Sequence, residues 1–228
     1  MIREIQKDLN DELVTEVLNY GIDIGEIGLD LLFDDEILRN IPILKTISSV
    51  CKVGLNIKDR YFAKKLLCFI NEYHSRQKDR EKFNKFISKM EDKKFNEKVT
   101  EKLIVIIDKM DEIENVKMIS ALFESFIDEK ITWSEFCQYS KCVNYINITD
   151  LKILKYLKND INNGYCIEET EFSKLEYSAN KLINYNFVFS KIINTFVYGD
   201  TPAKVIHYIT EDGLKFYSSL EKVIILGL

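Results

Sequence analysis

Cysteine and histidine, the side chains that most often carry chemistry in proteins, are few and scattered in this chain. Its 228 residues include seven of them, namely Cys51, Cys68, Cys137, Cys142, Cys166, His74 and His207. No two cysteines have the Cys-x-x-Cys spacing of a zinc site. The number of cysteines is odd and most have apolar neighbours, so we expect reduced thiols in a protein core. This pattern predicts a cytoplasmic protein without a bound metal.

No motif of a known catalytic site occurs in the chain. There is no Gly-rich phosphate loop, no His-Glu-x-x-His pair and no nucleophile elbow near either histidine. The segment 124–135 (ESFIDEKITWSE) is superficially similar to a calcium-binding EF-hand loop. However, Phe126 stands at a ligand position and Glu129 at the position of the required glycine. We therefore expect a turn between two helices there, and we predict no enzyme activity and no cofactor.

Two lysines in the last third of the chain are candidates for contacts with DNA. Lys174 and Lys181 fall in a helix expected at about 171–185, which would be the recognition helix of a winged-helix module. Glu171 and Glu176 lie in the same segment. Since phosphate contacts need a positive surface, these carboxylates favour a protein-docking module over a DNA reader. A transcriptional regulator that binds DNA stays an alternative.

Three glycines near the N-terminus have a spacing that favours close contact between helices. Gly21, Gly25 and Gly28 are three to four residues apart within residues 9–33, a segment with helical periodicity. Small residues at this spacing let two helices approach closely. We expect an interaction surface here, used for packing within the chain or for assembly into a homo-oligomer.

The next apolar segment, residues 41–57, would suit a core helix or a helix at a membrane surface. Pro42 is well placed in a first helical turn, and Lys45 and Lys52 are the only charged residues of the segment. A membrane-perturbing effector is therefore a second alternative. No run of about 18 apolar residues occurs, so we expect no membrane span. The charged N-terminus has no apolar core that would indicate a signal peptide.

The overall composition indicates a folded chain made mostly of helices. Hydrophobic residues make up 46% and charged residues 30%, with only 8 Gly and 2 Pro to form turns. Charge is distributed in blocks. Residues 1–57 hold 5 Lys and Arg against 11 Asp and Glu, whereas residues 58–109 hold 15 against 9. Such blocks can steer association, although interleaved charges on solvated helix faces explain them as well.

Helical periodicity over residues 58–75, 79–91, 96–112 and 114–128 predicts a helical body. Thr132 and Glu135 form a Thr-x-x-Glu capping box that should open a helix ending near Val143. Thr149 is expected to cap the following helix. We assign residues 1–158 to this body, with residues 1–57 as its glycine-containing apolar part.

After residue 158 the pattern changes to that of a small α+β module. A helical stretch is followed by two β-prone runs, at 187–198 and 203–209, with a turn expected at 199–202. A last helix follows Gly213. Helix, helix, hairpin and helix is the order of a winged helix. The predicted fold is thus mainly α, a multi-helix bundle with a winged-helix-like module at 159–228.

Three stretches together carry a resemblance to a known group of proteins. They are Gly21–Gly28 with Ile41–Ile57, the turn FESFIDEKITWSEF at Phe123–Phe136, and the ending YITEDGLKFYSSL at Tyr208–Leu220. In this order of elements the chain resembles bacterial and phage proteins of the abortive-infection alpha type. The resemblance implies a role in phage–host conflict and no catalytic residues. We therefore predict a non-enzymatic factor, of defence or counter-defence, that binds a protein partner.

Overall fold

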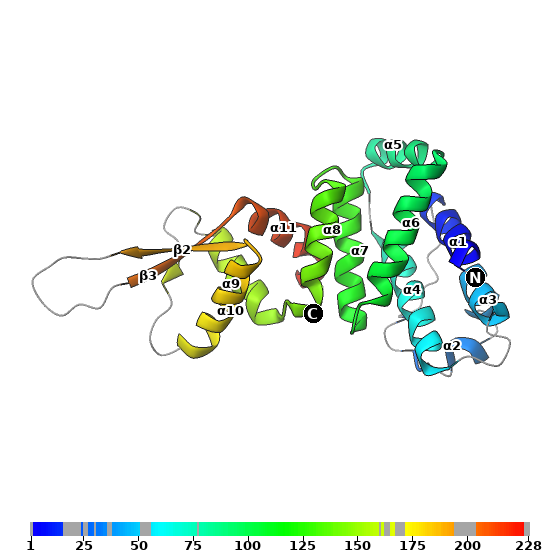
Figure 1. The fold of residues 1–228 in the computed structure, drawn as a ribbon, viewed down its shortest axis with the longest axis horizontal. Coiled ribbons are helices and arrows are strands. Elements are labelled where there is room, and N and C mark those ends of the chain that lie inside the picture. The colour runs from blue at the N-terminus through cyan, green and yellow to red at the C-terminus, as the bar shows by residue number, and fades with distance from the viewer. Residues whose placement is uncertain are drawn as a thin grey trace, which may run out of the picture. The chain divides into compact units, whose positions relative to one another are not determined.

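The computed structural model describes residues 2–15, 24, 27–29, 31–35, 38–50, 56–76, 78–159, 161, 165–166, 172–193 and 204–225. Over these ranges the chain forms eleven α-helices and a three-stranded antiparallel sheet (Figure 1). This confirms the predicted fold class, mainly α with a small α+β part near the C-terminus. The chain divides into two compact units, Met1–Asn144 (unit 1) and Tyr145–Leu228 (unit 2).

Unit 1 is built from helices whose apolar faces meet in one core. Its elements are α1 (Ile2–Val14), α2 (Leu31–Asp34), the 3-10 helix η1 (Leu38–Asn40), α3 (Pro42–Val50), α4 (Ile57–Ser75), α5 (Arg80–Met90), α6 (Lys93–Asp108), α7 (Ile113–Ile127) and α8 (Trp133–Cys142). Helix α4 packs against α3, α6 and α7, while α1 packs against α3, α5 and α6. The helical periods of residues 58–128 are therefore confirmed as buried stripes.

Phe123 lies at the centre of this core. It is fully buried, and its ring centroid is within 6.0 Å of those of five other aromatic rings, which belong to Phe69, Tyr73, Phe86, Phe126 and Phe136. Tilted and edge-to-face rings at such distances pack favourably beyond the area that they bury. One side chain of α7 thus fixes α4, α5 and α8 together.

The predicted capping box at the start of α8 is confirmed. The Thr132 backbone N–H donates to Glu135 Oε2 at 2.6 Å, and the Glu135 N–H donates to Thr132 Oγ1 at 3.2 Å. The segment that is similar to an EF-hand is the end of α7, a short turn and the start of α8. The expected turn between two helices is confirmed as well.

Helix α7 ends with a non-glycine residue in the left-handed region. Glu129 has a φ of 56°, its N–H donates to Phe126 O, and the Lys130 N–H donates to Ser125 O at 2.9 Å. These bonds form a Schellman motif, in which glycine is favoured because other residues bear a steric cost.

We expect Glu129→Gly to stabilise unit 1 by about 1 kcal/mol, since the relief of left-handed strain outweighs the extra freedom of glycine in the unfolded chain. Urea unfolding followed by the fluorescence of Trp133, the only tryptophan of the chain, measures the change. Glu129→Ala is the control, because it removes the same carboxylate but keeps the strain. A destabilised Glu129→Gly variant would contradict this account.

The helical periodicity of residues 9–33 does not correspond to one continuous helix in the described residues. Helix α1 ends at Val14, and residues 27–29 lie outside helices. At Gly28 an added Cβ would meet no atom within 4 Å, so the close helix approach expected there is not found. Glycines each cost a helix about 1 kcal/mol relative to alanine, which favours this break. Gly21 and Gly25 lie outside the described residues.

Pro42 begins α3, as predicted. The apolar face of α3, formed by Ile43, Leu44 and Ile47, is buried in unit 1, while Lys45 is exposed. Lys52 lies outside the described residues. Because α3 packs against α1 and α4, the face that would enter a membrane is already covered in this structure.

Unit 2 combines three helices with the small sheet. Its elements are α9 (Ile148–Asn159), β1 (Tyr165–Cys166), α10 (Phe172–Asn184), β2 (Val188–Ile193), β3 (Lys204–Ile209) and α11 (Glu211–Ile225). The strand order is β1-β3-β2 and both pairings are antiparallel. The two predicted β-prone runs are confirmed as β2 and β3, whereas the short strand β1 was not predicted.

Helix α9 belongs to unit 2, because it packs against α10, α11 and β3. The division of the chain therefore lies before α9, not after it. Thr149 as the cap of α9 is a wrong prediction. Asn147 takes this place, since its N–H donates to Asp150 Oδ2 at 2.7 Å and its Oδ1 accepts from the Asp150 N–H at 3.0 Å. An asparagine that precedes an aspartate by three residues forms the same reciprocal box as Thr132 and Glu135.

Candidate interaction site

The corner between β3 and α11 fixes the hairpin of unit 2 to its helices. The Thr210 N–H donates to Phe187 O at 3.0 Å, and Thr210 Oγ1 donates to Asn186 O at 2.6 Å. The same hydroxyl accepts from the Gly213 N–H at 3.0 Å, which caps α11. A Cβ on Gly213 would lie 2.1 Å from Phe187 O. The Thr-x-x-Gly sequence is therefore required by the close approach of two backbones.

Lys181, one of the two lysines proposed for DNA, is held within unit 2. Its Nζ lies 2.5 Å from Asp150 Oδ2 and donates to Tyr145 O at 2.9 Å. The Asp150 side chain has no exposed surface, and that of Lys181 is 16% exposed. Removing a charge from such a pair leaves an uncompensated buried ion, which is strongly unfavourable. Lys181 therefore ties α10 to α9, and this structure leaves its ammonium little access to a phosphate.

Tyr177, one helical turn before Lys181, is the most exposed aromatic residue described in α10. Its side chain is 70% exposed, and Lys181 Nζ lies 5.8 Å from its ring centre. Lys174 lies in the same helix. In charge, residues 145–228 hold 9 Lys and Arg against 10 Asp and Glu. This helix therefore presents the aromatic side chain of Tyr177 to solvent, while the ammonium of Lys181 is held by Asp150.

The hairpin has two faces of different character. On one face Phe189 pairs with Tyr208, their rings stack at 5.2 Å, and Lys191 Nζ lies 5.4 Å from the Tyr208 ring centre. On the other face Val188 and Ile209 are buried, and Ser190 lies beside the buried His207 at 2.7 Å. Ile192 and Val205 continue this second face and are paired in register.

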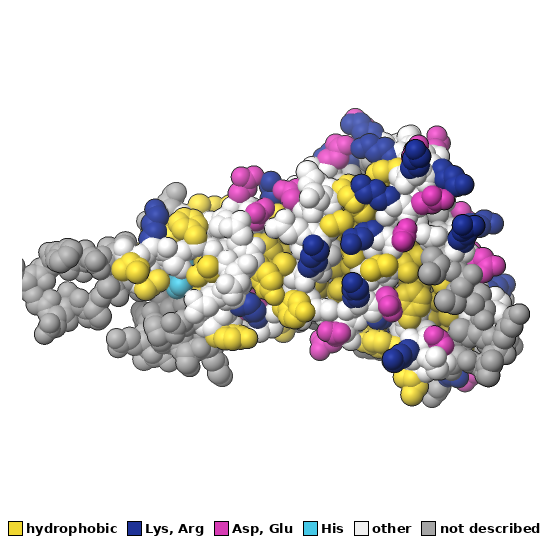
Figure 2. All heavy atoms as spheres, viewed as in Figure 1, with side chains coloured by type: hydrophobic (Ala, Val, Ile, Leu, Met, Phe, Trp, Pro, Cys, Tyr) yellow, Lys and Arg dark blue, Asp and Glu magenta, His cyan; other side chains and the backbone are white. Residues whose placement is uncertain are grey.

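Towards the end of the hairpin the residues of this second face are exposed to solvent, yet they are still apolar. Ile192 is 70% exposed and Val205 is 41% exposed. Phe189, on the opposite face, is 41% exposed. In Figure 1 the hairpin extends away from α9 and α10, and Figure 2 shows hydrophobic side chains on the same extension. We call the paired residues Ile192 and Val205, on the second face, the hairpin patch. Exposed apolar side chains that cluster in this way are typical of protein contact sites.

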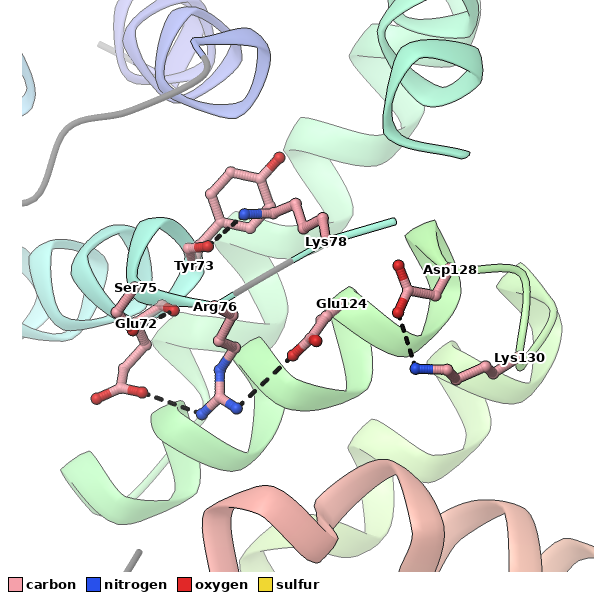
Figure 3. Close-up of polar contacts among 8 residues, drawn as sticks. All are labelled: Glu72, Tyr73, Ser75, Arg76, Lys78, Glu124, Asp128 and Lys130. Atoms are coloured by element: carbon pink, nitrogen blue, oxygen red, sulfur yellow. Dashed lines mark hydrogen bonds and ion pairs between the residues drawn. The ribbon is translucent and has the colours of Figure 1, made fainter. Parts of the chain in front are cut away.

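Unit 1 contains a cluster of charged side chains where α4 is joined to α5 (Figure 3). Arg76 Nη2 lies 3.0 Å from Glu72 Oε2, and its Nη1 lies 3.7 Å from Glu124 Oε2. Asp128 Oδ1 accepts from the Asp79 N–H at 3.1 Å, and its Oδ2 pairs with Lys130 at 2.8 Å. These contacts tie the α4–α5 connection to the end of α7. Each contact lies within unit 1, so the cluster stabilises the fold of this unit.

Lys78 lies beside these charged side chains and has a strongly perturbed ionisation. Its Nζ lies 3.7 Å from the Tyr73 ring centre and donates to Tyr73 O. Burial lowers the pKa of Lys78 to about 8, with a further lowering by Arg76, while Glu124 and Asp128 oppose the shift. The charged amine is therefore less favourable in the folded state than in the unfolded chain.

We expect the contribution of Lys78 to the stability of unit 1 to increase as the pH rises from about 8 towards 10. In this window the unfolded chain, whose lysine pKa is 10.5, binds a proton that folded Lys78 has lost, so the free energy of unfolding increases with pH. Urea titrations at several pH values measure this slope, and Lys78→Met should reduce it. Lys85→Met is the control, because Lys85 is an exposed lysine in a surface pair with Glu81. Equal slopes in wild type and Lys78→Met would contradict the assignment.

The remaining candidate residues are not brought together into one site. Lys45 lies on the surface of unit 1, and Lys64 and Lys65, part of the basic middle, donate to the backbone oxygens of Ile27 and Met110 within unit 1. Among the described residues no group of three possible metal ligands occurs. Within those same residues no helix is long and apolar enough to cross a membrane.

Sequence reasoning missed the residues that define the surface of unit 2. The Asn147-x-x-Asp150 box was available as a signal, and it would have placed Asp150 at the start of a helix. Nothing in the sequence, however, showed that Asp150 faces Lys181, since the two belong to different helices. The exposure of Ile192 and Val205 was also hidden, because apolar residues in a strand are expected to be buried.

Comparisons with known proteins add no relative. Neither a scan against models of protein families nor searches among curated proteins and solved structures found a match for this chain.

Proposed function

We propose that this protein is a non-enzymatic interaction factor of phage–host conflict, which binds a protein partner through unit 2. The observation that carries the proposal is the character of the unit 2 surface. A DNA-binding module would expose cations on its recognition helix, but Lys181 is paired with Asp150. Tyr177 and the hairpin patch expose aromatic and apolar surface instead. Aromatic and aliphatic anchors of this kind supply most of the affinity in protein–protein interfaces.

The context of phage–host conflict rests on the resemblance in the order of elements, from the N-terminal apolar segments to the Thr-x-x-Gly corner. The charged side chains around Arg76 and Asp128 contact one another within unit 1, and this supports a role without catalysis. Among the described residues, the buried face of α3 gives no support to a membrane-perturbing role.

The proposal is tested by a phage challenge of bacteria that express the chain. We expect the wild type to change the efficiency of plating of at least one phage, and the double variant Ile192→Asp/Val205→Asp to lose this effect. Both residues are already largely exposed, so the variant should fold, which circular dichroism checks. Ile57→Asp is the matched control, because Ile57 is 76% exposed but lies in unit 1.

Gel shifts with host and phage promoter DNA separate the proposal from its main alternative. We expect no tight binding to DNA. Salt-sensitive nanomolar binding that is lost on Lys174→Glu/Lys191→Glu would establish a transcriptional regulator instead. A plating effect that survives in the Ile192→Asp/Val205→Asp variant would also refute the proposed docking surface.

A further inference from the structure

One row of lysines on unit 1 has no role in the fold described above. Lys94, Lys98 and Lys102 recur every four residues on α6, so they lie on one face of that helix, with Val105 among them and Lys109 at the C-cap. In the part of the chain that the structure describes, Lys94, Lys98 and Lys102 form no ion pair. Lysines four residues apart repel one another slightly, so this row is a small cost to the helix.

On α8, Cys137 and Lys141 lie one helical turn apart, and Cys137 is near enough to Lys98 and Lys102 for their charges to act on its thiol. The thiol of Cys137 is half-buried, and its burial raises its pKa, while Lys102, Lys98 and Lys141 act on it in the opposite sense. Cations from two helices thus converge around Cys137. Figure 2 shows many Lys and Arg side chains, with hydrophobic ones between them, over the part of unit 1 where α6, α7 and α8 lie.

Apolar side chains lie among these cations. Val105 is 40% exposed, Cys137 is half-buried, and Trp133 is half-buried one helical turn before Cys137 on α8. The Trp133 ring packs on Phe126 and Phe136, with ring centres 5.2 Å apart in each pair. We call Lys98, Lys102, Val105, Cys137 and Lys141 the basic face.

We infer that the basic face binds a short segment of a partner protein in which acidic residues alternate with apolar ones. Charge complementarity requires the acids, and Val105 and Cys137 provide apolar surface between the lysines. The surface belongs to unit 1, so it is separate from the hairpin patch and does not depend on the proposed function of unit 2.

The charge pattern beside the basic face argues for a peptide rather than for nucleic acid. Glu97, Glu101 and Asp108 form an adjacent row along α6, and all three are exposed. A nucleic-acid backbone is uniformly negative. Where the nucleic acid is wider than the lysine row, its phosphates would lie against the acidic row and be repelled by it. A peptide can place its carboxylates opposite the lysines only, and neutral or basic residues opposite the acids.

Titration of the full chain with defined probes tests this inference, with Trp133 fluorescence as the signal. The probes are a synthetic peptide of alternating Glu and Leu, a peptide of the same charge with Ser in place of Leu, a single-stranded DNA oligonucleotide and vesicles of anionic phospholipid. We expect the Glu/Leu peptide to bind most tightly, with an affinity that falls as salt is added. Tighter binding of the Ser peptide, the oligonucleotide or the vesicles would overturn the inference, as would no response to the Glu/Leu peptide.

Matched charge reversals locate the site. Lys98→Glu/Lys102→Glu/Lys141→Glu should weaken binding of the Glu/Leu peptide about tenfold or more, which corresponds to about 1.4 kcal/mol. The control Lys85→Glu/Lys89→Glu/Lys93→Glu makes the same change in net charge at exposed positions elsewhere on unit 1. Equal weakening in both variants would overturn the inference.

A second measurement uses the wild type alone and so does not depend on the folding of a variant. The bound Glu/Leu peptide should slow alkylation of Cys137, followed by mass spectrometry of the proteolytic fragment that carries this residue. An unchanged alkylation rate at saturating peptide would exclude binding at the basic face.

Discussion

Replacing Lys181 with methionine is expected to destabilise unit 2 by about 3–5 kcal/mol. The variant leaves Asp150, whose side chain has no exposed surface, without the ammonium that lies 2.5 Å away. Tyr145 O also loses its donor. Because the chain has two units, hydrogen exchange followed by mass spectrometry is the suitable measurement, as it reports on unit 2 peptides separately.

Two further variants make this expectation specific. The double variant Lys181→Met/Asp150→Asn removes both charges and keeps an oxygen for the Asn147 N–H, so it should recover most of the lost stability. Lys215→Met is the control, because the pair of Lys215 with Glu211 is a surface pair between residues four apart, which is worth only a few tenths of a kcal/mol. If Lys181→Met alters stability no more than Lys215→Met, then Lys181 is available to a ligand and the DNA alternative gains support.

Gly213→Ala should destabilise unit 2 by about 3 kcal/mol, although the same substitution stabilises most helices. Its Cβ would lie 2.1 Å from Phe187 O, so either the Thr210–Phe187 hydrogen bond or the start of α11 must shift. A glycine this close to another backbone tolerates no side chain. Hydrogen exchange of α11 and β3 measures the loss.

Ser219→Ala provides a comparison within the same helix. Ser219 lies in α11 and donates to Lys215 O, so its replacement by alanine removes one local bond without a clash. We expect a change below about 1 kcal/mol for this control. A Gly213→Ala variant that is as stable as wild type would show that the corner can relax, and the Thr-x-x-Gly sequence would then need another explanation.

Local sequence patterns predicted the helices and their ends well. Thr132 with Glu135 opens α8, Pro42 opens α3, and the two β-prone runs form β2 and β3, because caps, turns and periodicity depend on neighbours within a few residues. The helical periodicity of residues 9–33 was a poorer guide to the structure. Apolar periodicity suggested a helix over 9–33, but α1 ends at Val14, before the glycines.

Pairings between distant residues could not be predicted. Asp150 and Lys181 belong to different helices, and Arg76 meets Glu124 from a separate part of the chain. Such pairs depend on how helices pack, which a single sequence does not specify. For the same reason the lysines of residues 58–109 looked alike in sequence, whereas the structure separates buried Lys65 from the exposed Lys98.

The strand order of unit 2 has a consequence for biosynthesis. Cys166 of β1 pairs with Ile206 of β3. Because α10 and β2 come between these strands in the sequence, β1 stays unpaired until both have been synthesised and β3 follows. A ribosome that has released residue 144 has already supplied every contact within unit 1, which can fold early, since domains generally fold in order from the N-terminus. The sheet of unit 2 can form only once β3 has been synthesised. Until β3 emerges, the apolar strand β2 lacks its partner, and this is the interval in which a nascent chain would most need protection from aggregation.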